Sequence, residues 1–389
     1  MSVSDADWAA LAADVSGAVY RPGMRGYEAA RSGVNSTGPA AVVRCRSAAD
    51  VAAAIGFARR TGLEVTLCRG HGLVLDLSGL RSVGIVDGMA RIGGGTRLGE
   101  VYQALATHRF RIPAGVDPSA GIVGETLAGG IGPLGRRHGL TCDRLVEAEV
   151  VLADGAVVVC DESREPDLFW ALRGGGPGMP GIVTGLRFAI VRDTPAVMAR
   201  VPYAHENVAE VIAAWQQRAP DAADEITAEL VVGRQAALTI YGATEFDLGI
   251  APAAEGSLPA ARTVTTQFID QPLSSATIRS LLDHLGDQPD ATLEFVPMGG
   301  AYNRVPADAT AFVHRGDRFL LKVGGSGQWA REAWELARAD GTGRAYQGYP
   351  EPELGEASYL GDNLDRLHRV RRHYDPEGVL TPARRGTAG

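Results

Sequence analysis

The chain has 389 residues, of which 45% are hydrophobic and 22% are charged, and it carries a formal net charge of −8 at pH 7. At roughly 150 residues per domain, this length predicts two or three domains with a large core. The acidic balance and the lack of a Lys/Arg-rich run argue against a nucleic-acid partner, because basic patches bind phosphate backbones. No apolar run approaches the ~20 residues that cross a membrane, so no membrane partner is expected either.

Cysteine spacing and the N-terminal residues bear on the compartment. Cys45, Cys68, Cys142 and Cys160 are scattered without CxxC pairing. This pattern predicts neither a disulfide framework nor a metal site, and it is typical of a reducing compartment. Residues 1–7 are acidic and lack the basic and apolar segments of a secretory signal. We therefore expect a cytoplasmic protein.

The first predicted elements form a β-α-β unit over residues 41–68. A short apolar strand is followed by Ser47, whose spacing to Asp50 resembles a capping box, and by a helix that Gly62 ends. The predicted strands of this region are Ala41–Val43, Glu64–Leu67, Leu73–Leu77 and one near Gly84–Val86.

The next elements are predicted from turn and cap residues. A helix should open after residues 93–95, with Thr96 as its N-cap, and run to about Thr107. Asp154-Gly155 offers the two positive-φ residues of a type I′ turn and therefore predicts a β-hairpin. The hairpin strands are Val146–Leu152 and Ala156–Cys160, and the helix Pro166–Leu172 and the strand Gly181–Ile190 follow.

Composition changes after Thr194-Pro195, where amphipathic helices alternate with strands. This alternation predicts an α+β domain with an antiparallel sheet. Residues 251–261 are predicted to form a loop, and the last helix is predicted around Leu364–His373. The helices of this half are Val208–Gln217 and Ser275–Leu285, and its strands are Ile226–Val232, Leu238–Tyr241, Leu293–Val296 and Phe319–Val323.

Glycine gathers at the ends of predicted strands between residues 70 and 181. Backbone N–H groups exposed in such loops form nests that bind an anion such as a pyrophosphate. Any single cluster is equally explained by a tight turn, but the recurrence favours a phosphate-bearing cofactor. Residues 130–135 match GxGxxG, yet no strand precedes them and Pro133 interrupts them, which disfavours a NAD-binding Rossmann unit.

A series of further motifs runs through almost the whole chain. They are Ile92-Gly93-Gly94-Gly95, Pro113-Ala114-Gly115, Gly124-Glu125-Thr126-Leu127-Ala128-Gly129-Gly130-Ile131-Gly132, Arg137-His138-Gly139-Leu140, Asp167-Leu168-Phe169-Trp170, Gly181-Ile182-Val183-Thr184, Pro297-Met298-Gly299-Gly300, His314-Arg315, Tyr346-Gln347-Gly348-Tyr349-Pro350 and Tyr374-Asp375-Pro376.

In this order the motifs resemble those of the berberine bridge enzyme-like oxidases, which have the vanillyl-alcohol oxidase fold. The resemblance is weakest in residues 200–290. It implies an α+β fold with a PCMH-type FAD-binding domain (residues 1–194) and an α/β substrate-binding domain on an antiparallel sheet (residues 195–345). Residues 346–389 would then return to the FAD-binding domain.

The resemblance also implies FAD as the cofactor. His71 matches the histidine that this family links covalently to flavin, and Asp117 stands where doubly linked relatives have a cysteine, so any link should be single. The loop after His71 is shorter than in the family, which leaves open a flavin-free relative that acts as a binding protein or a redox-neutral cyclase. The residues expected to bind the cofactor are Arg69, Gly70, His71, Gly72, Gly115, Gly121, Gly124, Thr126, Gly129, Gly132, His138, Gly181, Ile182 and Val183.

Tyr346 matches the tyrosine with which relatives remove the substrate proton, and Lys322 is expected nearby. A free tyrosine is only about 0.1% ionised at pH 7, so a neighbouring cation would help by favouring the tyrosinate. Tyr346 packed at the domain junction and Lys322 as a solvated strand residue remain the alternatives. The expected reaction is hydride transfer to FAD from an alcohol, amine or activated C–H of a small natural product or sugar, with O2 as the final acceptor.

Overall fold

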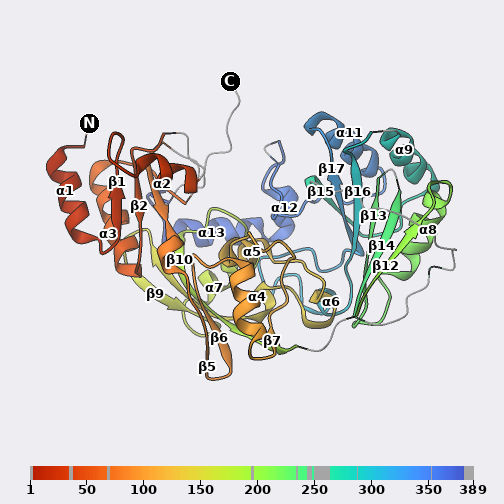
Figure 1. The fold of residues 1–389 in the computed structure, drawn as a ribbon, viewed down its shortest axis with the longest axis horizontal. Coiled ribbons are helices and arrows are strands. Elements are labelled where there is room, and N and C mark those ends of the chain that lie inside the picture. Colours follow the sequence, from red (N-terminus) through yellow and green to blue (C-terminus); the bar gives the residue numbers. More distant parts are fainter. Residues whose placement is uncertain are drawn as a thin grey trace.

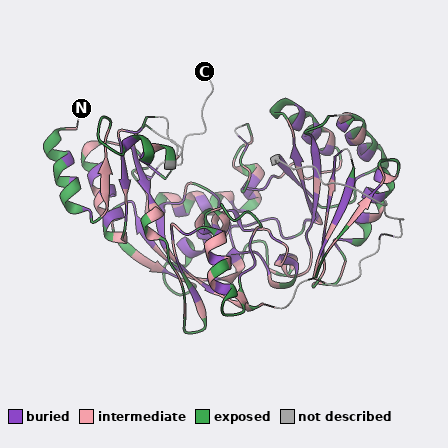
Figure 2. Cartoon of the chain, in the orientation of Figure 1, coloured by how far each residue is buried: buried purple, intermediate pink, exposed green. Residues whose placement is uncertain are grey.

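A computed structural model of the chain describes residues 3–34, 38–67, 71–193, 197–233, 235–242, 248, 263–286, 288–351 and 353–380. Its larger sheets have four, five and six strands. The first two lie together at one end of the molecule, and the third lies at the other end with its own helices (Figure 1). Buried residues concentrate where helices pack on these sheets (Figure 2). Within the described residues, no helix is long and apolar enough to cross a membrane.

The first sheet has the order β1-β2-β4-β3, in which β2 and β3 both run parallel to β4. The predicted β-α-β unit is confirmed, and Ser47 caps its helix by accepting from the Asp50 N–H at 3.1 Å. The predicted capping box is wrong, because the Asp50 carboxylate accepts instead from the N–H groups of Ser16 and Arg46. The elements are α1 (Asp5–Asp14), β1 (Ala18–Tyr20), α2 (Tyr27–Gly33), β2 (Ala41–Arg44), α3 (Ala48–Thr61), β3 (Val65–Thr66) and β4 (Leu73–Asp76).

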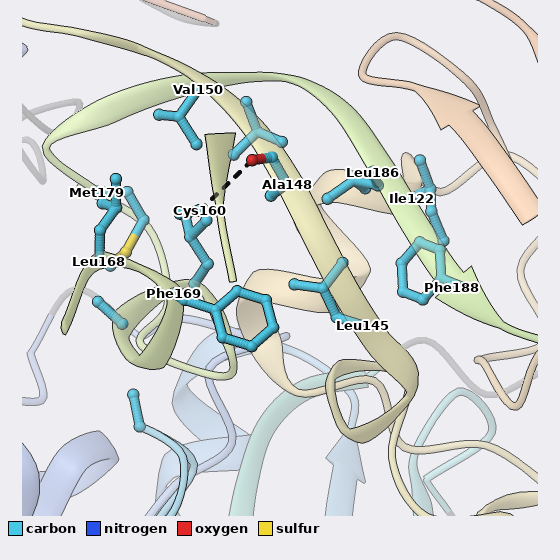
Figure 3. Close-up of a cluster of buried hydrophobic side chains, with 14 of the residues drawn as sticks. Ile122, Leu145, Ala148, Val150, Cys160, Leu168, Phe169, Met179, Leu186 and Phe188 are labelled. Carbon is cyan, nitrogen blue, oxygen red and sulfur yellow. Dashed lines mark hydrogen bonds between the residues drawn. The ribbon is translucent and has the colours of Figure 1, made fainter. Parts of the chain in front are cut away.

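The second sheet is antiparallel and has the order β5-β6-β10-β8-β9. Its apolar face forms a core with α4, α7 and α13, in which Phe169, Leu186 and Phe188 are buried (Figure 3). The Cys160 thiol donates to the Ala148 carbonyl at 3.5 Å inside this core. The elements are β5 (Val83–Val86), β6 (Met89–Gly93), α4 (Leu98–Ala106), α5 (Ile122–Ala128), α6 (Gly135–His138), β8 (Leu145–Leu152), β9 (Val157–Cys160), α7 (Pro166–Leu172), β10 (Gly181–Ala189) and the separate pair β7 (Phe110–Arg111) and β11 (Val191–Arg192).

Two Asp-Gly pairs make different turns. The predicted hairpin of β8 and β9 is confirmed, but its turn is not type I′, because Asp154 lacks the positive φ that Gly155 has. The connection is longer than two residues, and the Leu152 N–H donates to the Ala156 carbonyl across it. Both positive-φ residues of a type I′ turn occur at Asp87-Gly88, between β5 and β6.

Helix α4 begins later than its predicted cap. Arg97 is its N-cap, whereas Thr96 is buried. The Thr96 hydroxyl accepts from the Ser82 N–H and donates to the Ser82 carbonyl, both at 3.1 Å. Thr96 therefore does not cap the helix. It holds the glycine segment 93–95 against Ser82, the residue that precedes β5.

The third sheet has the order β12-β14-β13-β16-β17-β15, and all its pairs are antiparallel, as predicted. Helices α8, α9 and α11 pack on one face over a core with Trp215, Phe295 and Phe319. The strands β12 and β15 and the helix α11 were absent from the prediction. The elements are β12 (Val197–Tyr203), α8 (Val208–Arg218), β13 (Thr227–Val232), β14 (Ala236–Gly242), β15 (Thr263–Ile269), α9 (Ser275–Leu285), β16 (Thr292–Pro297), α10 (Ala301–Arg304), β17 (Phe319–Gly324) and α11 (Gly327–Ala337).

The C-terminal segment packs on the core of the second sheet. Ala345, Tyr359, Leu367 and Val370 are all buried there. In Figure 1, α13 lies beside the second sheet rather than with the third. The exact domain boundaries at residues 194 and 345 stay predictions. The helices of this segment are α12 (Ala357–Leu360) and α13 (Leu364–Tyr374).

Candidate active site

The glycines predicted to bind the cofactor fall into two groups. A Cβ added at Gly121 or at Gly124 would meet no atom within 4 Å, so the backbone at both positions faces open space. Both glycines belong to the segment around α5, and both are exposed. They leave room for a bound group to approach the backbone closely.

Other glycines of the same region are required by the packing of the chain itself. A Cβ at Gly129 would lie 2.5 Å from the Phe312 ring, and one at Gly132 would lie 1.9 Å from the Ala114 carbonyl oxygen. The Gly115 N–H donates to the Glu125 carboxylate at 2.6 Å. The many glycines of this region therefore leave room for a ligand beside the backbone. They also let chain segments that are far apart in the sequence approach each other closely.

The remaining predicted cofactor residues have varied surroundings. His71 is exposed, and Arg69 and Gly70 lie outside the described residues. Burial, and then the charges of the neighbouring arginines, lower the pKa of His138, which disfavours a positively charged ring beside a phosphate. The other residues pack within the protein. Gly72 lies against the Glu64 carbonyl and Gly181 against Val150, and the buried Thr126 hydroxyl donates to the Ile122 carbonyl. Ile182 belongs to the core of the first sheet and Val183 to the core of the second sheet.

The face of the third sheet opposite its helices carries polar side chains; we call it the inner face. Lys322 of β17 pairs with Glu294 of β16 in the strand register, and its Nζ lies 3.5 Å from the glutamate Oε2. The same Nζ lies 5.8 Å from the centroid of the Tyr349 ring. Burial opposes the charge on Lys322, but Glu294 and then Tyr349 outweigh it and raise the pKa of the lysine. Lys322 therefore stays protonated against an aromatic ring.

Tyr346 is a neighbour of Tyr349, and the centroids of the two rings lie 6.1 Å apart. Its hydroxyl oxygen accepts from the N–H groups of Gly130 and Ile131 at 3.2 and 3.3 Å. The side chain is buried, and burial, followed by the charge of Glu125, raises the pKa of Tyr346 well above its usual value. Tyr346 thus joins a glycine segment of the second sheet to the C-terminal segment, and it stays a predicted base.

Sequence reasoning missed three carboxylates of this region, Glu125, Glu229 and Glu294. Burial raises the pKa of both Glu125 and Glu229, although Lys322 opposes the rise in each. For Glu229 and Glu294 the signal in the sequence was a single charged residue within the otherwise largely apolar strands β13 and β16, flanked by apolar residues that face the core. Glu125 lies on α5 and has no such signal.

A cavity of about 350 Å³ lies where the segments around Gly115 and Pro133 meet the third sheet. Tyr241 of β14 belongs to its lining and comes from the inner face. The remaining lining is mostly apolar and includes Tyr102, Ile112, Ala114, Val116 and Leu134. Its volume falls in the range of ligand pockets, about 300 to 1,000 Å³.

Arg136 joins the two halves of the site, a role that no local sequence pattern indicates. Its side chain is fully buried, although it belongs to the short helix α6. Its guanidinium donates to the backbone carbonyls of four residues from the third-sheet region: Ile226, Pro220, Met298 and Ala222. This contact holds the glycine segments against the third sheet.

Comparison with known proteins agrees with this architecture. A family model described as an FAD binding domain matches residues 39–161, and one described as berberine and berberine like matches residues 345–381. Wild-type BBE-like 1 of Physcomitrella patens superposes with a TM-score of 0.83 at 23% identity, over 95% of this chain and 97% of that one.

Two sequence relatives carry the comparison further. (R)-6-hydroxynicotine oxidase of Paenarthrobacter nicotinovorans is 35% identical over 186 residues, which is 44% of this chain and 40% of that enzyme. YgaK of Bacillus subtilis (strain 168), an uncharacterized FAD-linked oxidoreductase, is 30% identical over 91% of this chain and 93% of its own length. The fold and these relatives define an FAD-dependent oxidoreductase. The chain belongs to the berberine bridge enzyme-like FAD-linked oxidoreductases.

The residues present fit FAD. Gly121 and Gly124 leave open space in front of the backbone within the matched FAD-binding segment. Asp117 is exposed, and its carboxylate accepts from the Ser119 N–H and hydroxyl, so it offers no thiol for a second flavin link. Membership of the family favours FAD over the flavin-free alternative.

Proposed function

We propose that this protein is an oxidase that removes a hydride and a proton from an alcohol, an amine or an activated C–H of a small organic molecule, a natural product or a sugar. FAD supplies the hydride acceptor, and O2 is the final acceptor, leaving as hydrogen peroxide. The observation that carries the proposal is the placement of Lys322 against Tyr349 beside the glycine segments of an FAD-binding domain.

The chain's own contribution is to take up the substrate proton. The Tyr349 hydroxyl is the proposed acceptor, because its ring faces the Lys322 ammonium and is only partly buried. A cation close to the ring stabilises the negative charge that develops on the phenol oxygen. Glu294 keeps Lys322 in place from the neighbouring strand. Tyr346, whose hydroxyl is held by two backbone N–H groups, is less well placed for this exchange.

Residues around the cleft also exclude water. The cavity lining is mostly apolar, and the buried Arg136 holds α6 against the third-sheet region. An electrostatic contact such as that of Lys322 with Tyr349 is stronger where water is excluded. The proposed site therefore uses a small number of polar groups in a largely apolar cleft.

The purified protein should show the visible absorption of oxidised flavin and should release hydrogen peroxide with one member of a panel of alcohols, amines and sugars. Flavin that is reduced anaerobically by a substrate and reoxidised by air would support the assignment of O2. A protein that contains no flavin and takes up none when FAD is added would contradict the proposed function.

Replacing His71 with alanine should leave flavin that denaturant releases, whereas the wild-type protein should keep its flavin on the polypeptide. His71 is exposed, so a bound flavin would have access to its ring. The measurement is flavin absorbance in the protein pellet after acid precipitation, with His108→Ala, an exposed histidine of α4's C-terminal turn, as the control. Complete release from the wild type would remove His71 as the attachment point.

A further inference from the structure

Glu229 is a carboxylate of the inner face that the proposed proton transfer does not use. It lies on β13 opposite Thr239 of β14, and two residues further along, Val231 is opposite Glu294 of β16. Residues two apart on a strand share one face of a sheet. Glu229 and Glu294 therefore both lie on the inner face, which points away from the helices of the third sheet.

The charge of Lys322 is already engaged by Glu294 and the Tyr349 ring. Glu229, by contrast, has no hydrogen-bond or ion-pair partner within the described part of the chain. Burial raises the pKa of Glu229, and the nearby Glu294 adds to the rise while Lys322 opposes it. Glu229 is half-buried, and a partly desolvated carboxylate without a partner would be stabilised by a cation placed against it.

Glu229 lies next to the cavity. Thr227 pairs with Tyr241 and Glu229 with Thr239, so Glu229 and Tyr241 are diagonal neighbours on the inner face. Burial, and then the charge of Glu229, raise the pKa of Tyr241 to about 12, which is consistent with this proximity. Since Tyr241 lines the cavity, a ligand in the cavity can reach Glu229 past this ring.

Among the described residues, Arg111 and Arg200 are two further cations of this region, and neither forms an ion pair with Glu229. Arg111, which belongs to the lining, forms an ion pair with Asp193 at 2.5 Å. Arg200 of the edge strand β12 is exposed and opposite Thr239, with no ion pair to Glu229. Glu229 therefore lies beyond Tyr241 as a carboxylate without an ion-pair partner among the described residues, and the lining of the cavity is mostly apolar.

We propose that the substrate carries a basic nitrogen, which Glu229 binds as an ammonium group while an apolar or aromatic body fills the cavity. The inference rests on the proposed function and narrows its substrate to amines. A neutral sugar would leave Glu229 without a counter-charge, and a carboxylic acid would be repelled by it. Glu229 is then a residue that determines specificity.

The first test uses three probes of similar shape that differ in charge: 4-phenylbutylamine, 4-phenylbutan-1-ol and 4-phenylbutanoate. Isothermal titration calorimetry on the flavoprotein as isolated should show that the amine binds about tenfold or more tightly than either of the others, as expected for a charge-assisted contact. Equal binding of the alcohol, or tighter binding of the carboxylate, would overturn the inference. This comparison needs only the wild-type protein.

The second test replaces Glu229 with glutamine, which keeps the shape of the side chain and removes its charge. The preference for the amine over the alcohol should fall to about threefold or less. Glu225→Gln is the matched control, because Glu225 is exposed just before β13 and its replacement removes one negative charge outside the cleft. Retention of the full preference in Glu229→Gln, or its loss in Glu225→Gln, would contradict the role of Glu229.

Failure of this inference and failure of the proposed oxidase function are distinguishable. A flavoprotein that oxidises a neutral alcohol or sugar and binds no amine would overturn the inference and leave the oxidase function intact. A protein that binds the amine through Glu229 but contains no flavin would overturn the oxidase function alone, since calorimetry reports binding without turnover.

Discussion

Replacing Tyr349 with phenylalanine is expected to slow anaerobic flavin reduction by about 10²-fold or more, since loss of a general base typically has an effect of this size. The variant keeps the ring that packs near Lys322 and removes only the hydroxyl that takes the proton. Stopped-flow measurement of flavin reduction, with the substrate found in the peroxide screen, gives the rate. The flavin content and the substrate Kd should stay close to those of the wild type.

Tyr346→Phe is the matched control for this variant. Its hydroxyl accepts from the N–H groups of Gly130 and Ile131, so its loss should reduce stability more than the rate of hydride transfer. Lys322→Met should also slow flavin reduction, though less than Tyr349→Phe, because the proton acceptor remains. If flavin reduction is slow in Tyr346→Phe and proceeds at the wild-type rate in Tyr349→Phe, Tyr346 is the base.

Replacing Arg136 with methionine should lower the free energy of unfolding by about 3 kcal/mol or more, because buried carbonyls without a donor each cost about 1 to 3 kcal/mol. Four carbonyls lose their donor in this variant: those of Ile226, Pro220, Met298 and Ala222. Equilibrium denaturation in urea, followed by circular dichroism, measures the change. Its size sets Arg136 apart from surface arginines, whose replacement usually changes stability by less than about 0.5 kcal/mol.

Arg137→Met is the control, because Arg137 adjoins Arg136 on the same short helix but is exposed. If both variants unfold at the same denaturant concentration as the wild type, Arg136 does not hold the two halves together. A loss confined to Arg136→Met, with reduced substrate affinity but unchanged flavin content, would locate the effect at the junction with the third sheet.

The fold could be predicted where local signals agree with tertiary structure. The Ser47 cap, the hairpin around Gly155 and the helix Ser275–Leu285 all follow from residues adjacent in sequence. The strand β12 was missed because its pattern of burial is weak, as expected of an edge strand. The type I′ assignment at Asp154-Gly155 was wrong because the dipeptide does not by itself fix the length of the connection.

The candidate site was predictable only in part, because its polar groups meet through strand register and domain packing. Glycine recurrence indicated the FAD-binding segments, but nothing local shows that Glu294 lies opposite Lys322, or that Glu229 lies diagonal to Tyr241. In the sequence Arg136 is one of two adjacent arginines, and no local pattern distinguishes it from Arg137. Its burial depends on carbonyls that are about 80 to 160 positions away in the chain.

The return of the C-terminal segment has a consequence for biosynthesis. Leu367 and Val370 complete the core of the second sheet, whose first strand is made near residue 83. During translation this sheet therefore exposes apolar surface until α13 (Leu364–Tyr374) has left the ribosome, while the third sheet can already close over its own helices. The flavin-binding half, although first to be synthesised, is the last to acquire its finished interior.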